Sequence, residues 1–361
     1  MSARLAVPVT ALAARRGSEG LLTLAAAHPG ARIGVAAPTP GEQERFASQL
    51  GDRVSFGPGA LEELASTPGT VVVNGIVGSA GLPASVAALE AGNRLALANK
   101  ESLVAGGPVV LDALARGGGE LIPVDSEHSA LAQSLLGESA AAVRRLILSA
   151  SGGPFRGRSA DELAEVTVAE ALDHPTWAMG PRITVDSATL MNKAFEVIEA
   201  HYLFGIGYDR IDVVVHPQSI VHSLVEFVDG SLKAQLGEPD MRVPIQWAIT
   251  HPERAEGVLE PFSLAGRDLT FEAPDPGAFP CLRLGYEAGR MGGSAPAVLN
   301  AADEIAVGAF LEHRIGFGSI PAVVERTLGT VEHREVETVA DVLAVDAEAR
   351  AAASAAIGGS C

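Results

Sequence analysis

The sequence predicts an α/β protein with a parallel-sheet N-terminal domain, an α+β second domain, a linker and a C-terminal helical domain. Three observations support this prediction. Strand-like and helix-like segments alternate over residues 31–124, a hairpin pattern follows the middle of the chain, and the last segment has a helix-favouring composition without strand signals. A chain of 361 residues is also too long for one core of ordinary size, so an interdomain cleft is expected.

The N-terminal domain is predicted over residues 1–126. Four runs with strand character, ARIGVAA, TVVVNGIVG, RLALA and ELIPV, are separated by Ala- and Leu-rich stretches such as LPASVAALEAG and VVLDALARG. This alternation indicates a parallel sheet covered by helices. We interpret the opening MSARLAVPVTALAARRG as a first strand region, because Pro8 interrupts the apolar stretch that a secretory signal would need.

The second domain, predicted over 127–250, carries start signals for helices and a hairpin. Ser159 with Glu162, and Thr167 with Glu170, are capping-box pairs that predict two helix N-termini. The runs VHSLVEFV and SLKAQL flank an Asp-Gly pair at 229–230, a strong hairpin signal.

The remaining chain is divided by composition. Proline, glycine and charge become dense after the second domain, which predicts a linker over 251–276. The stretches SAPAVLNAADEIAVGAFLEH and ADVLAVDAEARAAASAAI then predict a helical domain over 277–361.

The net charge limits the partners. A formal charge of -18 disfavours nonspecific binding to nucleic acid or an anionic membrane, and no apolar run approaches the roughly 20 residues that span a bilayer. Cys281 and Cys361 form neither a disulfide framework nor a metal-ligand spacing, so we interpret both as structural or incidental and expect a cytoplasmic protein.

Three carboxylates are candidates for a metal site. Asp125 and Glu127 follow a predicted strand and would project to the same side of an extended backbone, while Asn192 and Glu196 lie four residues apart on a predicted helix with Lys193 beside them. Three oxygen ligands with open positions suit Mg²⁺ or Mn²⁺, which could polarise a keto-alcohol. Taken singly, each acid is better explained as a strand-end cap or a solvated surface charge, and only the combination points to a metal.

Two loops are candidates for substrate contacts. Ser151 opens a Ser-Gly-Gly-Pro turn after an apolar run and, with Ser187, Asn192 and Lys193, could bind a phosphate, although an ordinary glycine turn has the same pattern. The stretch HPTWAMG from 174 to 180 is typical of a loop that closes over a ligand, or of a Trp packing on a core edge. The histidines lack zinc-ligand spacing, and no Walker motif or G-x-S-x-G elbow occurs.

Together these stretches resemble the 1-deoxy-D-xylulose 5-phosphate reductoisomerase family, in order and spacing, from about residue 71 to about residue 348. The motifs that resemble it are ANKESLV (98–104), PVDSEHSA (123–130), SASGGPFR (149–156), HPTWAMG (174–180), VDSATLMNKAFEVIEA (185–200), HPQSIVHS (216–223), QLGEPDMR (235–242) and LNAADEIAV (299–307). The resemblance implies a Rossmann-like N-terminal domain, a homodimer, and metal-dependent rearrangement of 1-deoxy-D-xylulose 5-phosphate followed by NADPH reduction to 2-C-methyl-D-erythritol 4-phosphate, an isoprenoid precursor.

The resemblance also implies roles for individual residues. It assigns Asp125, Glu127 and Glu196 as metal ligands and, with Lys100 and His174, as catalytic residues. The sugar phosphate would contact Ser126, Ser151, His174, Ser187, Asn192 and Lys193, under a flap that contains Trp177 and Met179. The nicotinamide cofactor would contact Asn99, Lys100, Glu101, Gly180 and Met241, and its pyrophosphate would contact Gly17, Ser18 and Gly20.

The N-terminus departs from the family pattern. Where the family has a GSTGSIG turn, this chain has ARRGSEG, with Ala14, Arg16 and Glu19 at altered positions. The next loop, AAPTPGEQ, offers neither a cation nor free amides for a 2′-phosphate. Three alternatives follow: a working reductoisomerase, a paralogue that acts on a related sugar phosphate or isomerises without efficient hydride transfer, and a noncatalytic phosphosugar binder. The intact metal and phosphate set argues against the third, and the nicotinamide-side residues Asn99, Lys100 and Met241 favour the first over the second. A generic NAD dehydrogenase is disfavoured.

Overall fold

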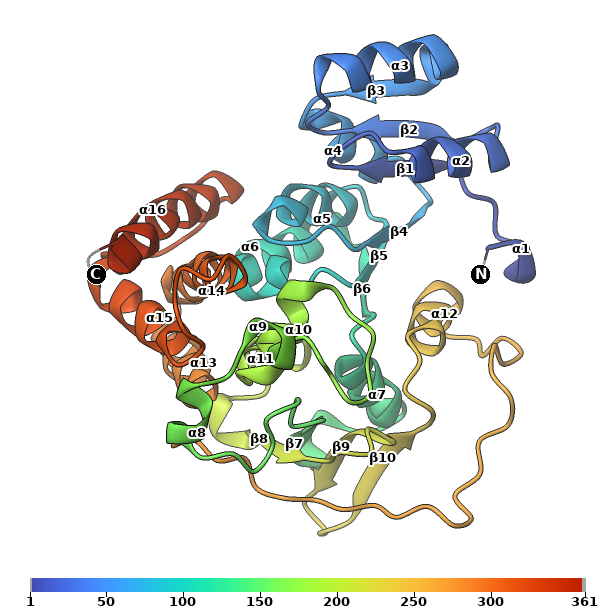
Figure 1. Cartoon of the computed structure of the whole chain (residues 1–361). Coiled ribbons are helices and arrows are strands. Elements are labelled where there is room, and N and C mark those ends of the chain that lie inside the picture. The colour runs from blue at the N-terminus through green and yellow to red at the C-terminus, as the bar shows by residue number, and fades with distance from the viewer. Residues whose placement is uncertain (1, 359–361) are drawn as a thin grey trace.

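The computed structural model describes residues 2–358, and its N-terminal part alternates strands with helices as the sequence predicts (Figure 1). The elements are α1 (Ser2–Leu5), β1 (Ala11–Ala14), α2 (Glu19–Ala27), β2 (Arg32–Val35), α3 (Pro40–Leu50), β3 (Val54–Phe56), α4 (Gly59–Ala65), β4 (Val71–Asn74), α5 (Leu82–Glu90), β5 (Arg94–Leu97), α6 (Lys100–Gly117) and β6 (Glu120–Pro123). The predicted first strand region is confirmed at β1, and the helix α1 precedes it.

The parallel strands form two sheets rather than one. Their orders are β1-β2-β3 and β4-β5-β6, and within the described residues no ladder joins β1 to β4. Val71 and Val73 on β4 stay exposed at 39% and 49%, as expected of an unpaired edge. Figure 1 shows the first sheet, with α2 and α3, as a separate layer above the second. The alternation of strands and helices predicted parallel strands covered by helices, but in a single sheet rather than the two that the structure has.

The central part of the chain is α+β. Its elements are α7 (Ser126–Leu135), β7 (Val143–Ala150), α8 (Ala160–Ala164), α9 (Val168–Ala171), α10 (Pro181–Ala188), α11 (Met191–Phe204), β8 (Ile211–Val215), β9 (Val221–Phe227), β10 (Leu232–Leu236) and α12 (Arg242–Thr250). Both capping boxes are present at the starts of α8 and α9, although these helices have only five and four residues. The hairpin is confirmed as the antiparallel pair β9 and β10, in a sheet of order β10-β9-β7-β8.

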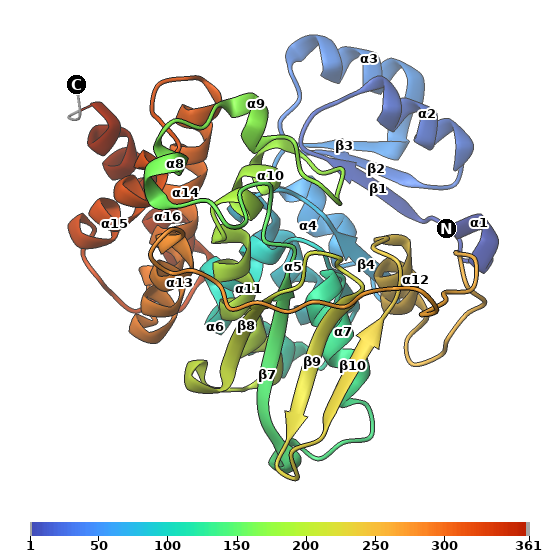
Figure 2. The same ribbon diagram turned by 60° about the horizontal axis from the view of Figure 1, so that its bottom comes forward.

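An irregular segment follows α12 and runs across the β7–β10 sheet before the last helices begin (Figure 2). It is tied to the sheet by a bridge between Val215 and Glu272. The C-terminal helices are α13 (Pro280–Met291), α14 (Ala295–Leu311), α15 (Ser319–Thr330) and α16 (Val339–Gly358). Cys281 is a buried, free cysteine, whereas Cys361 lies outside the described residues.

Helix α11 lies between the other helices and packs closely on two of them, because glycines face it. A Cβ at Gly107 of α6 would lie 2.3 Å from a ring atom of Tyr202, and one at Gly285 of α13 would lie 2.4 Å from Cβ of Ala194. These contacts bring the start of α6 beside α11. None of the described helices is long and apolar enough to cross a membrane.

Candidate active site

The candidate site forms where two helices begin after neighbouring parallel strands. Strands β5 and β6 pair in register and are followed by α6 and α7. The side chain of Asn99 caps α6 by accepting from the amide of Ser102 at 3.2 Å, and that of Asp125 caps α7 by accepting from the amide of Glu127 at 3.3 Å. Both helix starts therefore lie at the carboxyl edge of the sheet, the usual place for a ligand in such folds.

The three predicted metal-ligand carboxylates meet here. Asp125, Glu127 and Glu196 each offer an oxygen, and these oxygens lie within 4.8 Å of one another. The predicted reason was wrong, however: Asp125 and Glu127 do not alternate along an extended strand, because β6 ends at Pro123 and Glu127 is already in the first turn of α7. The convergence comes from the helix start and from α11, which brings Glu196.

Two ammonium groups lie among these carboxylates. Nζ of Lys100 is 2.8 Å from Oδ2 of Asp125 and 3.5 Å from Oε1 of Glu196. Nζ of Lys193 is 3.0 Å from Oε1 of Glu127 and also contacts Glu196. Asn192 links Lys100 to Glu196, because its Oδ1 accepts from Lys100 and its Nδ2 donates to Glu196, each at 2.6 Å. The predicted spacing of Asn192 and Glu196 on one helical face is thus confirmed.

Burial and mutual repulsion set the protonation of the site. Burial, followed by the charge of Glu127, raises the pKa of Glu196 to about 7. Burial opposes ionisation of Asp125 as well, but the adjacent Lys100 charge holds its pKa well below the usual range. For Lys193, the charges of Glu127 and Glu196 outweigh burial and raise the pKa. In this structure the two ammonium groups supply the positive charge that the crowded carboxylates require.

The donor set fits a hard divalent cation. Carboxylate oxygens are the ligands that Mg²⁺ and Mn²⁺ prefer, and three of them leave positions open for substrate oxygens. Two further groups complete the surroundings, and sequence reasoning missed both: His128 and Glu199, which with Asp125 form a second cluster of potential ligands. Each lies three residues after a predicted ligand, and this helical spacing could have identified them.

His128 and Glu199 lie behind the three carboxylates. Nδ1 of His128 is 3.4 Å from Oδ1 of Asp125 and 3.6 Å from Oε2 of Glu199, and its Nε2 is 2.9 Å from the carbonyl oxygen of Glu196. Burial disfavours the charged imidazole, but Glu199 and Asp125 outweigh it and raise the pKa of His128 to about 9. His128 therefore faces Oδ1 of Asp125, whereas Lys100 contacts Oδ2 of the same carboxylate.

A cavity of about 220 Å³ opens in front of this cluster. It is lined by residues of α6, α7, α10, α11 and the turn after β7, and by the loop that precedes α10. The predicted site residues among its lining are Lys100, Asp125, Ser126, Glu127, Ser151, His174, Ser187, Asn192, Lys193, Glu196 and Met241, together with Trp177 and Met179 of the predicted flap. The structure thus brings the predicted metal, substrate and flap residues to one cavity.

His174 connects the flap to the Ser151 turn. Its Nδ1 accepts from the backbone amides of Thr176 and Trp177, at 3.1 and 2.9 Å. That leaves Nε2 to carry the hydrogen and to donate to Oγ of Ser151, 3.0 Å away. Burial lowers the pKa of His174, which agrees with a neutral ring. Gly153 in the same turn donates its amide to Ser151, and glycine is required there because φ is 64° and a Cβ would lie 2.8 Å from the carbonyl oxygen of Ser187.

The residues predicted to contact the nicotinamide fall into two groups. Lys100 and Met241 line the cavity, whereas Asn99, Glu101 and Gly180 do not. Asn99 is buried and donates to the carbonyl of Gly78 at 3.0 Å, and Glu101 accepts from the amide of Gly78 at 2.9 Å. Asn99 and Glu101 therefore hold the loop after β4, while Gly180 is the N-cap residue of α10.

Gly17 and Ser18 lie in the turn between β1 and α2 and Gly20 lies in the first turn of α2, and none of the three lines the cavity. Oγ of Ser18 accepts from the amide of Leu21 at 3.2 Å and so caps α2. The loop after β2 carries no cation of its own, and Arg16 of the preceding turn pairs with its Glu42, with Nε 3.0 Å from Oε2. Glu42 also accepts from the amide of Thr39 in a capping box.

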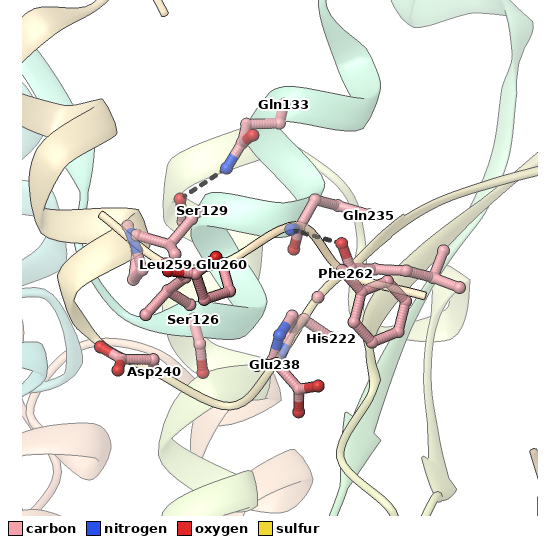
Figure 3. Close-up of a pocket in the computed structure, with 14 residues that line it drawn as sticks. Ser126, Ser129, Gln133, His222, Gln235, Glu238, Asp240, Leu259, Glu260 and Phe262 are labelled. Atoms are coloured by element: carbon pink, nitrogen blue, oxygen red, sulfur yellow. Dashed lines mark hydrogen bonds between the residues drawn. The ribbon is translucent and has the colours of Figure 1, made fainter. Parts of the chain in front are cut away.

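A second cavity, of about 170 Å³, lies on the other side of the α7 N-terminus (Figure 3). It is bordered by His222, Glu238 and Asp240 and by Phe262 of the irregular segment. Of the predicted site residues only Ser126 lines it. Ser126 lines both cavities and donates to Glu127 at 2.6 Å.

Comparison with known proteins gives one consistent family. The model "1-deoxy-D-xylulose 5-phosphate reductoisomerase" matches residues 3–107, the C-terminal domain model of the same name matches 121–204, and "DXP reductoisomerase C-terminal domain" matches 236–352. The 1-deoxy-D-xylulose 5-phosphate reductoisomerase of Xanthomonas campestris is 57% identical over 298 residues, covering 81% of this chain and 75% of that protein. The enzyme of that name from Methylobacillus flagellatus is 51% identical over 310 residues, covering 84% and 78%.

Solved structures agree. The 1-deoxy-D-xylulose 5-phosphate reductoisomerase from Zymomonas mobilis in complex with NADPH has a TM-score of 0.90 and 42% identity, over 97% of this chain and 91% of that one. A DOX-P reductoisomerase in complex with NADPH, fosmidomycin and magnesium has a TM-score of 0.88 and 37% identity, over the same shares. With three family models along its length and relatives above half identity, the chain belongs to the 1-deoxy-D-xylulose 5-phosphate reductoisomerase family.

Proposed function

We propose that this protein rearranges 1-deoxy-D-xylulose 5-phosphate and reduces the product with NADPH to 2-C-methyl-D-erythritol 4-phosphate. The observation that supports this most strongly is the meeting of three carboxylate oxygens within 4.8 Å at the floor of a cavity that also holds Lys100, Asn192 and Lys193. A keto-alcohol phosphate has the matching groups: adjacent oxygens at one end and an anion at the other.

The metal ligands in this proposal are Asp125, Glu127 and Glu196. A divalent cation bound there supplies Lewis acidity toward the substrate's carbonyl and hydroxyl oxygens. Lys100 is the catalytic cation of the chain itself, because its ammonium lies between Asp125 and Glu196 and faces the cavity. It would stabilise negative charge on a substrate oxygen and could return a proton to it.

The opposite end of the substrate would be held by hydroxyl, amide and ammonium donors. Ser151, Ser187, Asn192 and Lys193 supply these donors from the turn after β7, from α10 and from α11. Ser126 and His174 complete the substrate contacts, with His174 donating through Nε2. The loop with Trp177 and Met179 would then exclude water from the reacting atoms.

For the cofactor we propose a nicotinamide end near Lys100 and Met241, supported by Asn99, Glu101 and Gly180. Bound NADPH supplies the hydride for the reduction. The pyrophosphate end would lie over the turn of Gly17, Ser18 and Gly20, at the N-terminus of α2. This end fits less well, because Glu19 extends from the same turn and pairs with Arg45. The isomerase without efficient hydride transfer is therefore the second candidate function.

We also propose that the protein is a cytoplasmic homodimer that binds a small sugar phosphate. Its domains in this proposal are residues 1–126 and 127–250, a linker at 251–276, and residues 277–361. Strand β10 is an edge of its sheet, and Leu232 on it is 58% exposed. Such an edge is a surface that a second copy can cover.

The direct test follows NADPH absorbance while the purified protein is mixed with Mg²⁺ or Mn²⁺ and 1-deoxy-D-xylulose 5-phosphate, with NADH in a parallel reaction. Metal-dependent oxidation of NADPH supports the proposal. If NADPH is not consumed but a rearranged aldehyde phosphate accumulates, the second candidate replaces it. If the substrate binds and no product forms, the noncatalytic alternative replaces both.

A further inference from the structure

Arg182 lies directly after the flap loop but does not face the substrate cavity. It is the second residue of α10, whose N-cap residue is Gly180, and its side chain is only 16% exposed. The guanidinium contacts three separate parts of the chain: the start of α6, its own helix α10, and α14. The neighbouring side-chain oxygens are Asn300 Oδ1 at 2.9 Å, Glu304 Oε2 at 3.0 Å, Glu101 Oε1 at 3.3 Å, Asp303 Oδ2 at 3.4 Å and Asp186 Oδ2 at 3.7 Å.

The contact to Glu101 leads to the nucleotide-binding edge. The same Oε1 that faces Arg182 accepts from the amide of Gly78, at 2.9 Å, and Oε2 accepts from Asn99 at 2.8 Å. Gly78 belongs to the loop after β4, and a Cβ there would lie 3.1 Å from Oε2 of Glu304. Because ligands in open parallel sheets lie against the loops at the carboxyl ends of strands, this loop is where a dinucleotide would make contact.

The guanidinium is surrounded by more carboxylates than it needs. Glu304 is also paired with Arg350, through two contacts of 2.9 Å. Burial, followed by the charge of Asp303, raises the pKa of Asp186 well above its usual range, and burial raises the pKa of Asp303 to about 6. The side chains of Asp186 and Asp303 also hydrogen-bond each other, so the two carboxylates can share one proton. Arg182 can therefore exchange one acceptor for another without leaving its charge unpaired.

We propose that Arg182 is a positioning residue that couples occupancy of the β4–α6 edge by the cofactor to closure of the Trp177 loop. The coupling rests on the proposed function, since it requires a dinucleotide at that edge. A ligand against the Gly78 loop changes which hydrogen bonds the carboxylate of Glu101 accepts. Arg182 passes this change to the first turn of α10, where the loop ends. Two packing arrangements of one shared arginine are the kind of element that can link two sites.

The experiment uses Trp177 as the reporter. The chain has two tryptophans, so Trp247→Phe leaves Trp177 alone. Calorimetry measures NADP⁺ binding, and acrylamide quenching of Trp177 is measured with and without saturating NADP⁺. The variants Arg182→Gln and Arg182→Lys are made in this background. The matched control is Arg283→Gln, because Arg283 also contacts two carboxylates, Glu287 and Glu325, but on the outer surface of α13 and α15.

The coupling predicts that NADP⁺ lowers the quenching constant of Trp177 by at least about twofold in the reporter protein and in Arg283→Gln. In Arg182→Gln, NADP⁺ should still bind within about threefold of the reporter's affinity, while the quenching constant no longer changes. Arg182→Lys keeps the charge but loses the planar guanidinium, so NADP⁺ should change its quenching constant by at most half as much as in the reporter protein. This variant tests the coupling if Arg182→Gln does not fold.

Protection of Trp177 that persists in the Arg182 variants would overturn the coupling, as would a reporter protein that binds NADP⁺ with no change in quenching. A folded reporter protein that binds no NADP⁺ would overturn the cofactor proposal together with the coupling, so the two failures are distinguishable.

Discussion

Nζ of Lys100 lies 2.8 Å from Oδ2 of Asp125, although the two residues stand at the starts of different helices. The contact arises because β5 and β6 are adjacent parallel strands, so α6 and α7 begin side by side. Asp125 is thereby held between the Lys100 ammonium and the ring of His128. An ionised carboxylate is thus fixed in the cavity before any cation binds.

Replacing Glu196 by Gln should lower the metal-dependent activity at least about 100-fold while leaving the fold intact. The amide keeps the volume but loses the charge that a divalent cation needs. Activity assays over a Mg²⁺ titration and circular dichroism measure the two effects, and chelation should reproduce the loss in the parent protein. Glu138→Gln is the control, since Glu138 pairs with Lys233 at the surface. Wild-type activity in Glu196→Gln would refute the metal assignment.

The stability that His174 provides should depend on pH. Burial lowers its pKa from the ordinary 6.5, so the neutral ring is the folded form. Its contribution is complete above about pH 6.5 and is lost as the pH falls through the lowered value, because protonated Nδ1 cannot accept from Thr176 and Trp177. His174→Asn offers a non-titrating acceptor near the position of Nδ1. The difference in Tm between parent and variant should therefore shrink from about pH 8 to about pH 5. A constant difference would contradict this role.

Gly17 in the β1–α2 turn and Gly20 in the first turn of α2 should respond oppositely to alanine. A Cβ at Gly17 would lie 2.8 Å from the buried ring of Phe46, so Gly17→Ala should cost about 1–3 kcal/mol in the free energy of unfolding. The nearest atom to a Cβ at Gly20 is 3.8 Å away, and the residue is helical, so Gly20→Ala should be neutral or stabilise by about 0.5 kcal/mol. Denaturant unfolding measures both. If Gly20→Ala nevertheless weakens NADPH binding, the pyrophosphate lies over this turn.

Packing on α11 should control the site from a distance. A Cβ at Gly285 would meet Ala194 of α11 at 2.4 Å, so Gly285→Ala should destabilise the protein by at least about 1–3 kcal/mol and reduce activity, because α11 also carries Glu196. Gly308→Ala is the matched control: it is helical, with nothing within 4 Å of the added Cβ, and should stabilise by up to about 1 kcal/mol. Equal effects of the two substitutions on Tm would contradict this account of the packing.

Local patterns predicted much of the fold. Both capping boxes, the hairpin around 229–230 and the alternation of strands and helices depend on residues close together in sequence, and the structure has all of them. Local patterns could not predict that β1 and β4 remain unpaired, because strand pairing depends on how distant segments meet.

The sequence by itself determined the family, since motif order and residue type identify it, and the same motifs supply the acidic, basic and hydroxyl groups to which we assign the chemistry. Only the tertiary structure decided how those groups meet. Asp125 and Glu127 converge through a helix start rather than a strand, and His128 with Glu199 enters the site behind them. Arg182 joins Glu101 to Asp303 across about two hundred residues. Such contacts depend on burial and on the close packing of α6, α10, α11 and α14, which no local pattern encodes.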